Sequence, residues 1–211
     1  MRPDSAERIA ETGVIAILRG VSVEDAPDVA AAVMEGGVTA LEITADTPDV
    51  TAAIEAVADR VDAAVGVGTV LDPETARAAQ LAGAEFVVTP TVNRAVIRTA
   101  NRYGTPIAAG AYTPTEALDA FEAGADFVKV FPAKTGGPAH VAALGGPLPQ
   151  IPLVPTGGVS ADNAGAYVEA GAAAVGVGSA IVDHDAVEAG EYDRIAANAR
   201  AVVEAVATAR D

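Results

Sequence analysis

The stretch EAGADFVKV, residues 122–130, contains the pattern that decides the fold. It reads as the last turn of a helix, a glycine just beyond the helix where a positive φ is needed, and a short buried strand. The same pattern returns as MEGGVTALEI (34–43), LAGAEFVV (81–88) and EAGAAAVGV (169–177). A junction that recurs in this way indicates that helices and strands alternate along the chain.

Eight strands are predicted in all, and RYGTPIAAG and QIPLVPTGG repeat this junction in weaker form between the copies already quoted. They cover 14–19, 39–44, 63–69, 86–90, 106–111, 127–131, 152–156 and 174–178. The segments between them, such as DPETARAAQLAG and TPTEALDAFEAG, start with Asp, Thr or Pro and have an apolar face of helical period. Such alternation predicts parallel βαβ units, and eight units close into a (β/α)8 TIM barrel. We expect one barrel domain over residues 1–211.

An open doubly wound sheet is the alternative fold. Its dinucleotide-binding fingerprint is incomplete here, because GVGTVL (66–71) and GVGSAI (176–181) both lack the third glycine.

The composition restricts the environment and the partners. The chain has no cysteine, and its 29 acidic and 13 basic residues give a net charge of −16. Such an acidic surface repels nucleic acid and anionic membranes. No apolar run reaches the roughly 18 residues that span a bilayer, and the polar N-terminus does not resemble a signal peptide. We therefore expect a cytoplasmic protein without nucleic-acid or membrane partners, and the scarcity of lysine favours a salt-loving source over an ordinary acidic one.

Both lysines of the chain lie in FVKVFPAK, residues 127–134. Strand alternation places Phe127, Lys129 and Phe131 on one face, which points into the barrel if the intervening valines meet the helices. Burial disfavours the charged form of an amine, and a neutral amine is what a Schiff-base nucleophile requires. Lys129 is thus a candidate nucleophile, with a surface lysine as the alternative, whereas Lys134 is expected in a loop.

A carboxylate shares that interior face. In ALEIT, residues 40–44, Glu42 and Thr44 alternate with outward-facing apolar residues. Glu42 could pair with Lys129, because a buried carboxylate needs a partner, or it could act as a general acid/base. Thr69, at the end of the third strand, could line the site or simply be packed in the barrel.

Two glycine-rich segments follow the last two strands. PTGGVSADN (155–163) and GVGSAIV (176–182) occupy the positions where this fold commonly binds phosphate, although tight turns alone would also use these glycines. His140 and His184 lack carboxylates at metal-ligand spacing and are read as solvated, so no metal site is predicted.

Together, Glu42, Thr69, Lys129 followed by FPA, the PTGG turn and GVGSA resemble the 2-keto-3-deoxy-6-phosphogluconate (KDPG) aldolase family. The likeness runs from about Val14 to Val206. It implies a class I aldolase of the Entner–Doudoroff pathway that needs no cofactor and is usually a homotrimer. Its substrate would be a phosphorylated keto-sugar acid, cleaved to pyruvate and glyceraldehyde 3-phosphate.

The resemblance also implies roles for individual residues. Lys129 would form the Schiff base and Glu42 would be the acid/base. Thr156 matches the gluconate-type members, so we expect the gluconate epimer with some tolerance of the galactonate one. Thr69 would contact the pyruvyl part, and Gly157, Gly158 and Ser179 would hold the phosphate. The predicted substrate-binding set as a whole is Arg19, Thr69, Phe131, Thr156, Gly157, Gly158, Gly178 and Ser179.

One position departs from the family pattern. Many bacterial members read E-x-T-x-R after the second strand, but this chain has Asp46 in place of the arginine. Arg19, at the end of the first strand, is the nearest candidate for a substitute ligand of the substrate carboxylate or phosphate, and a surface salt bridge is its alternative. Two other function classes stay open on the residues alone. One is a phosphosugar isomerase or epimerase with Glu42 as base, and the other is a non-catalytic anion-binding barrel.

Overall fold

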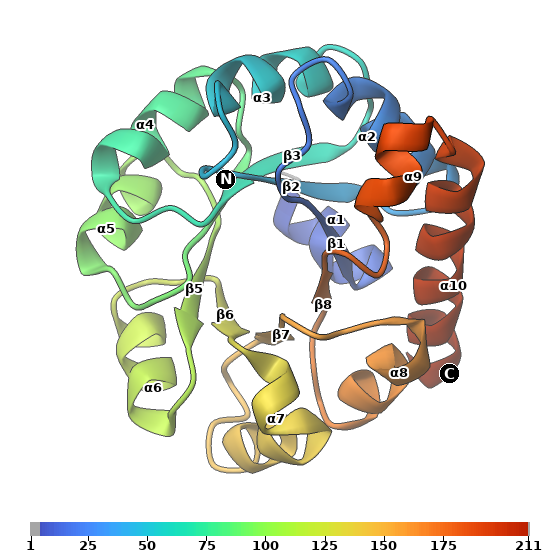
Figure 1. Ribbon diagram of the computed structural model, residues 1–211. Helices are drawn as coiled ribbons and strands as arrows, with labels where there is room; N and C mark the ends of the chain where they lie inside the picture. Colours follow the sequence, from blue (N-terminus) through green and yellow to red (C-terminus); the bar gives the residue numbers. More distant parts are fainter. Residues whose placement is uncertain (1–4, 211) are drawn as a thin grey trace.

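A ring of eight strands surrounded by helices forms the structure (Figure 1), a computed structural model that describes residues 5–210. Residues 1–4 and 211 of the expected domain lie outside the described part. The strands are β1 (Val14–Leu18), β2 (Ala40–Thr44), β3 (Ala64–Gly68), β4 (Phe86–Val88), β5 (Ile107–Ala111), β6 (Phe127–Val130), β7 (Leu153–Pro155) and β8 (Val175–Val177). Each begins and ends within two residues of its predicted bounds, so the barrel prediction is confirmed.

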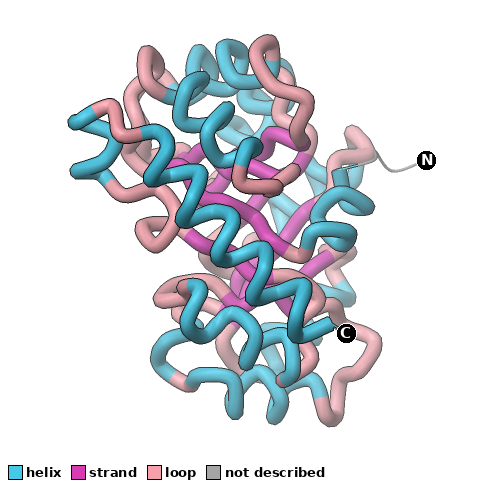
Figure 2. The backbone as a smooth tube through the Cα atoms, turned by 90° about the vertical axis from the view of Figure 1, so that its right-hand side faces the viewer, coloured by secondary structure: helices cyan, strands magenta, loops and turns pink. Residues whose placement is uncertain are grey.

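Helices follow the strands in regular alternation. They are α1 (Ser5–Thr12), α2 (Ala26–Glu35), α3 (Val50–Ala58), α4 (Pro73–Leu81), α5 (Arg94–Arg102), α6 (Pro114–Glu122), η1 (Ala133–Thr135), α7 (Gly137–Gly145), α8 (Ala161–Glu169), α9 (His184–Ala189) and α10 (Tyr192–Arg210). Side-chain caps explain several starts, because Asp72, Asn93 and Thr113 accept backbone N–H groups of the first turn. Figure 2 shows α10 running diagonally across the outside of the barrel. No helix within residues 5–210 has the length and apolarity to cross a membrane.

The sheet is parallel throughout, with the strand order β7-β6-β5-β4-β3-β2-β1-β8. The ring closes between β7 and β8 through a short seam. It consists of a bridge between Thr156 and Gly176 and a hydrogen bond of 2.9 Å from the Ala173 N–H to the Leu153 carbonyl. The last two strands are thus joined by fewer contacts than the other neighbours in the barrel.

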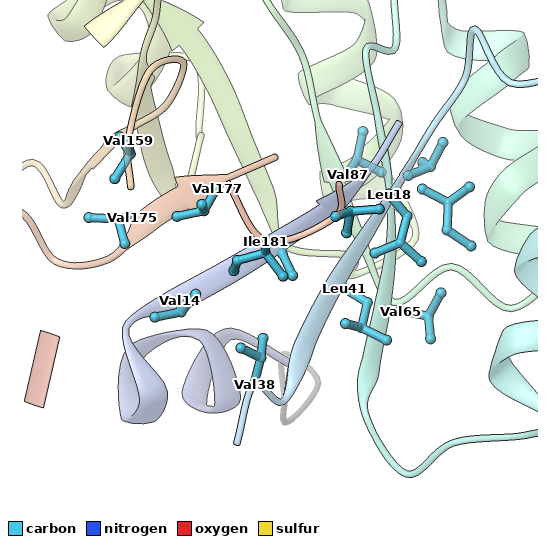
Figure 3. Packing of buried hydrophobic residues seen from close by; sticks show 14 of the residues in the cluster. Val14, Leu18, Val38, Leu41, Val65, Val87, Val159, Val175, Val177 and Ile181 are labelled. Carbon is cyan, nitrogen blue, oxygen red and sulfur yellow. The ribbon is translucent and has the colours of Figure 1, made fainter. Parts of the chain in front are cut away.

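Strand alternation divides the core into two layers. Outward-facing residues such as Leu41, Val65 and Val177 are buried against the helices (Figure 3). Inward-facing residues near the amino ends of the strands form a second cluster, in which Phe86 is 1% exposed. Ile9 of α1 belongs to this inner cluster, so α1 closes the amino end of the barrel.

Candidate active site

A cavity of about 220 Å³ opens at the carboxyl ends of β1, β6, β7 and β8. Functional sites of this fold lie at that end, because the loops after the strands converge there. Eight of the residues predicted from the sequence line it: Arg19, Lys129, Phe131, Thr156, Gly157, Gly158, Gly178 and Ser179. Glu42 and Thr69, the other two predicted residues, are not in its wall.

Lys129 lies on β6 inside the barrel, as strand alternation predicts. Its side chain is 4% exposed, and its Nζ is 5.2 Å from the centre of the Phe131 ring. Among the described residues it has neither a hydrogen bond nor an ion pair. A buried amine without a partner in a cavity is available to react with a ligand.

Glu42 lies on β2 and is 2% exposed. A side chain at Gly68 on the neighbouring strand would overlap this carboxylate, because a Cβ there would be 1.7 Å from Oε1. Within residues 5–210, Oε1 has no hydrogen-bond partner and no cation lies within 4.0 Å of the carboxylate. The ion pair between Glu42 and Lys129, one of the two alternatives for this carboxylate, is therefore not formed among the described residues. An unpartnered buried carboxylate oxygen is costly for stability and common where a group awaits a ligand or a proton.

Arg19 connects the ends of the first three strands. It donates a hydrogen bond of 2.9 Å from Nη2 to Thr69 Oγ1, and its Nη1 forms an ion pair of 2.5 Å with Asp46. Burial would by itself raise the pKa of Asp46, but the Thr44 hydroxyl and the Arg19 charge outweigh it, so the pKa is lowered. Asp46, at the position where the resemblance leads us to expect an arginine, therefore holds an arginine that follows β1. The salt bridge expected as an alternative for Arg19 exists, and Arg19 lines the cavity as well.

Thr69 reaches this group through an unusual backbone conformation. Alternation along β3 would direct it outward with Val65 and Val67. Its φ of +58° lies in the left-handed region, which interrupts the alternation and lets its hydroxyl meet Arg19.

The turn after β7 contains two glycines that no other residue could replace without strain. Gly157 and Gly158 have φ values of +92° and +83°. The turn is tied to η1 by hydrogen bonds from Ala133 N–H to Thr156 O (2.8 Å) and from Lys134 N–H to Gly157 O (2.9 Å). Lys134 itself is exposed and belongs to the short helix η1 rather than to the loop that was predicted for it.

The two histidines, both predicted to be solvated, have different surroundings. His140 is partly buried, stacks on Tyr112 with 4.5 Å between ring centres, and its Nε2 is 2.8 Å from the Tyr112 carbonyl oxygen, so that prediction is wrong. His184 is exposed but lines the cavity. Its position was missed because nothing in the local sequence DHD signals that it faces a strand end more than 160 residues earlier. Ile17, Val159 and Val182 complete the wall.

The described residues contain no group of three or more His, Cys, Asp or Glu side chains arranged to hold a metal ion. What the site offers is an amine, a carboxylate, a guanidinium and two glycine-rich turns. Gathered at the carboxyl ends of the strands, these groups give the protein the architecture of a (β/α)8-barrel enzyme.

A family model for KDPG and KHG aldolases matches residues 6–198. The 2-dehydro-3-deoxy-6-phosphogalactonate aldolase of Escherichia coli (strain K12) is 38% identical over 196 residues, which cover 91% of this chain and 93% of that one. The KHG/KDPG aldolase of the same strain is 37% identical over 203 residues, 95% of each chain. A crystal structure of KDPG aldolase from Legionella pneumophila, with pyruvate captured at low pH as a covalent carbinolamine intermediate, superimposes with a TM-score of 0.86 at 30% identity, over 95% of this chain and 98% of that one. The chain belongs to the KDPG and KHG aldolase family and is an aldolase, a carbon–carbon lyase.

Proposed function

We propose that the protein is a class I aldolase that cleaves 2-keto-3-deoxy-6-phosphogluconate to pyruvate and D-glyceraldehyde 3-phosphate. The observation that carries this proposal is the buried, unpartnered amine of Lys129 at the cavity. Its support is the Legionella pneumophila relative, in which pyruvate is bound as a covalent carbinolamine.

The reaction begins with attack of the Lys129 amine on the keto carbon C2 of the substrate. A carbinolamine forms and loses water to give an iminium ion. The iminium accepts the electron pair of the C3–C4 bond as the C4 hydroxyl loses its proton, so glyceraldehyde 3-phosphate leaves and an enamine remains. Protonation at C3 and hydrolysis then release pyruvate and the free amine.

Glu42 is assigned the proton transfers of this sequence. Its unpartnered Oε1 is free to take the proton of the C4 hydroxyl and to return one to C3 of the enamine. Gly68 leaves the space that the carboxylate occupies, so a glutamate at this depth depends on a glycine in the next strand.

Arg19 and Thr69 are assigned to the pyruvyl carboxylate. The hydrogen bond of Arg19 to Thr69 and its ion pair with Asp46 draw the guanidinium towards β2 and β3, the side on which Glu42 lies. Guanidinium groups bind carboxylates with paired hydrogen bonds, so a cation from β1 replaces the arginine that Asp46 displaces from the family pattern.

The opposite wall of the cavity is assigned to the rest of the substrate. Gly157, Gly158, Gly178 and Ser179 would hold the phosphate, since glycines after the last two barrel strands allow close backbone approach. Phe131 would pack against the carbon chain. Thr156 would recognise the C4 hydroxyl, which favours the gluconate epimer with some tolerance of the galactonate one.

The wider setting follows from the resemblance and the charge. We infer a cytoplasmic homotrimer that acts in the Entner–Doudoroff pathway, which sedimentation would test through the mass of the particle. The net charge of −16 supports a halophilic source, because salt screens repulsion between carboxylates. Full stability in dilute buffer would contradict that inference.

Trapping with pyruvate and borohydride tests the mechanism directly. Borohydride should reduce the imine and leave one reduced pyruvyl unit on Lys129, located by mass spectrometry of the peptides. Because the chain has only two lysines, Lys134→Arg is a matched control that should keep the adduct. An adduct on Lys134 in the parent protein would move the nucleophile. No adduct at all would favour an isomerase, an epimerase or an anion-binding barrel.

A further inference from the structure

The proposed phosphate end of the cavity has few formal charges to offer. A phosphate ester carries about 1.5 to 2 negative charges near neutral pH. The glycines of the two turns contribute backbone dipoles, and Ser179 contributes a neutral hydroxyl. Of the cationic side chains in the wall, Lys129 is committed to the proposed chemistry and Arg19 is already paired with Asp46.

His184 is the remaining side chain in the cavity wall that can carry a positive charge. It is the first residue of α9, which Figure 1 shows beside α2 and α10 and next to the ends of β8 and β1. Its ring lies against Gly20, where a Cβ would be 3.5 Å from the His184 Cε1. The imidazole therefore occupies the wall between the end of β1 and the Gly178–Ser179 turn.

The imidazole nitrogens are free to bind a ligand. Neither nitrogen of His184 has a hydrogen bond or an ion pair with any of residues 5–210. His140 is different, since its Nε2 already lies 2.8 Å from the Tyr112 carbonyl oxygen. The two histidines of the chain thus provide one free imidazole at the cavity and one that is engaged elsewhere.

The charged groups around His184 are mostly paired with one another. Asp183 forms an ion pair with Arg194 of α10 and accepts the N–H groups of Asp185 and Ala186. Arg194 also binds Glu191, and Arg19 binds Asp46. Asp185 and Glu188, both on α9, are neighbouring carboxylates that have no side-chain partner within the described chain. Besides Lys129, the side chains of the wall that can carry a positive charge are His184 and Arg19, and Lys134 of η1 lies against Gly158.

We propose that His184 is a further substrate-binding residue, which adds a proton-dependent positive charge to the phosphate end of the cavity. The inference rests on the proposed aldolase function and identifies a contact that the sequence did not reveal. Imidazole is the side chain that ordinarily gains charge between pH 8 and pH 5. Because His184 is exposed, its charge should strengthen anion binding by up to about five-fold, the upper range for an exposed ion pair.

Sulfate is the appropriate probe, because it remains a dianion across this range while a phosphate ester titrates near pH 6. Its competitive inhibition constant against the phosphorylated substrate would be measured from pH 8 to pH 5.5 at constant ionic strength. In the parent protein and in the matched control His140→Gln, the constant should fall by up to about five-fold towards pH 5.5. In His184→Gln it should stay level.

A parallel fall in all three proteins, or no competitive inhibition by sulfate at any pH, would overturn the proposal. Either result would leave the aldolase mechanism intact as long as pyruvate still forms its borohydride adduct on Lys129. Loss of that adduct in the parent protein would instead remove the mechanism, so the two failures are distinguishable.

Discussion

The two ends of the barrel are built from the same eight strands and are filled in opposite ways. At the amino end, Phe86 and Ile15 pack together inside the ring, and Ile9 of α1 closes it. At the carboxyl end, Lys129 and Glu42 are equally buried but have polar atoms without partners. One end fills its interior by packing, and the other places polar side chains in its interior that have no partner among the described residues. Stability and chemistry are therefore separable along the barrel axis.

The largest effect expected from breaking this division is at Lys129. Lys129→Arg keeps the positive charge, but a guanidinium remains protonated and cannot attack a keto carbon. Turnover should fall by at least about 1,000-fold in an aldolase assay, while circular dichroism stays that of the parent. Residual turnover above one part in roughly a hundred would mean that the amine is not the nucleophile.

At the amino end, the corresponding change is Phe86→Ala. Removing a ring that is 1% exposed leaves a cavity next to Gly66, and the free energy of unfolding should drop by about 3–5 kcal/mol in a urea titration. Turnover per folded molecule should stay close to that of the parent. Leu81→Ala, at a residue that is 71% exposed, is the control and should change stability by no more than about 0.5 kcal/mol. A large drop in turnover per folded molecule would show that the two ends are coupled.

Glu42→Gln should have the next largest effect. It keeps the shape of the side chain beside Gly68 but removes the base, so cleavage and pyruvate C3 deuterium exchange should slow by roughly 100-fold. Imine formation, measured by borohydride trapping, should persist. Deuterium exchange at the parental rate would leave Glu42 without a role in proton transfer.

Arg19→Ala sharpens the assignment of the carboxyl end itself. Loss of a charge-assisted hydrogen bond should weaken binding by roughly 10- to 100-fold. If Arg19 holds the pyruvyl carboxylate, KM for the full substrate and the pyruvate concentration needed for imine formation should rise together. A rise for the phosphorylated substrate alone would move Arg19 to the phosphate, and no change would remove it from the site.

The smallest expected effect concerns a helix on the outside of the barrel. The carboxylate of Glu116 accepts three hydrogen bonds, from the backbone N–H of Tyr112, the backbone N–H of Thr113 and the hydroxyl of Thr113. These bonds lower the pKa of Glu116 below the ordinary 4.5. A carboxyl whose pKa is lower in the folded state than in the unfolded state stabilises the fold at pH values above its unfolded-state pKa. This contribution is lost as the pH falls through the folded-state pKa. Glu116→Gln should therefore cost about 0.5–1 kcal/mol at pH 7 and progressively less below pH 4.5 in urea titrations. Glu204→Gln, at an exposed residue of α10, is the control and should change the free energy of unfolding at pH 7 by no more than about 0.5 kcal/mol.

Much of this architecture was predictable because helices and strands have characteristic spacings of apolar residues along the sequence. The repeated helix–glycine–strand junction marks most of the strands, and alternation places Lys129 and Glu42 inside the ring. Features that depend on two distant segments were not. The ion pair of Arg19 with Asp46 joins neighbouring strands through side-chain conformations that no periodicity encodes.

The orientation of Thr69 also differs from what strand alternation predicts, for a different reason. A left-handed φ at a residue other than glycine is rare, and its presence at the end of β3 could not be anticipated from the surrounding residues. His184 is exposed as predicted, but its place in the cavity wall was missed, because polar neighbours are equally typical of a solvated turn and of a cavity rim.

The short seam between β7 and β8 has a further consequence for local opening of the barrel. Gly157 and Gly158 follow one side of the seam, and Gly178 and Ser179 follow the other. A ligand held by both turns would act as a staple across the most sparsely bonded junction of the ring. Amide hydrogen exchange in β7 and β8 should therefore slow with ligand concentration, following RT ln(1 + [L]/Kd), more than exchange in β3 and β4. The junction between β7 and β8 would then be protected against local opening only while a ligand is bound.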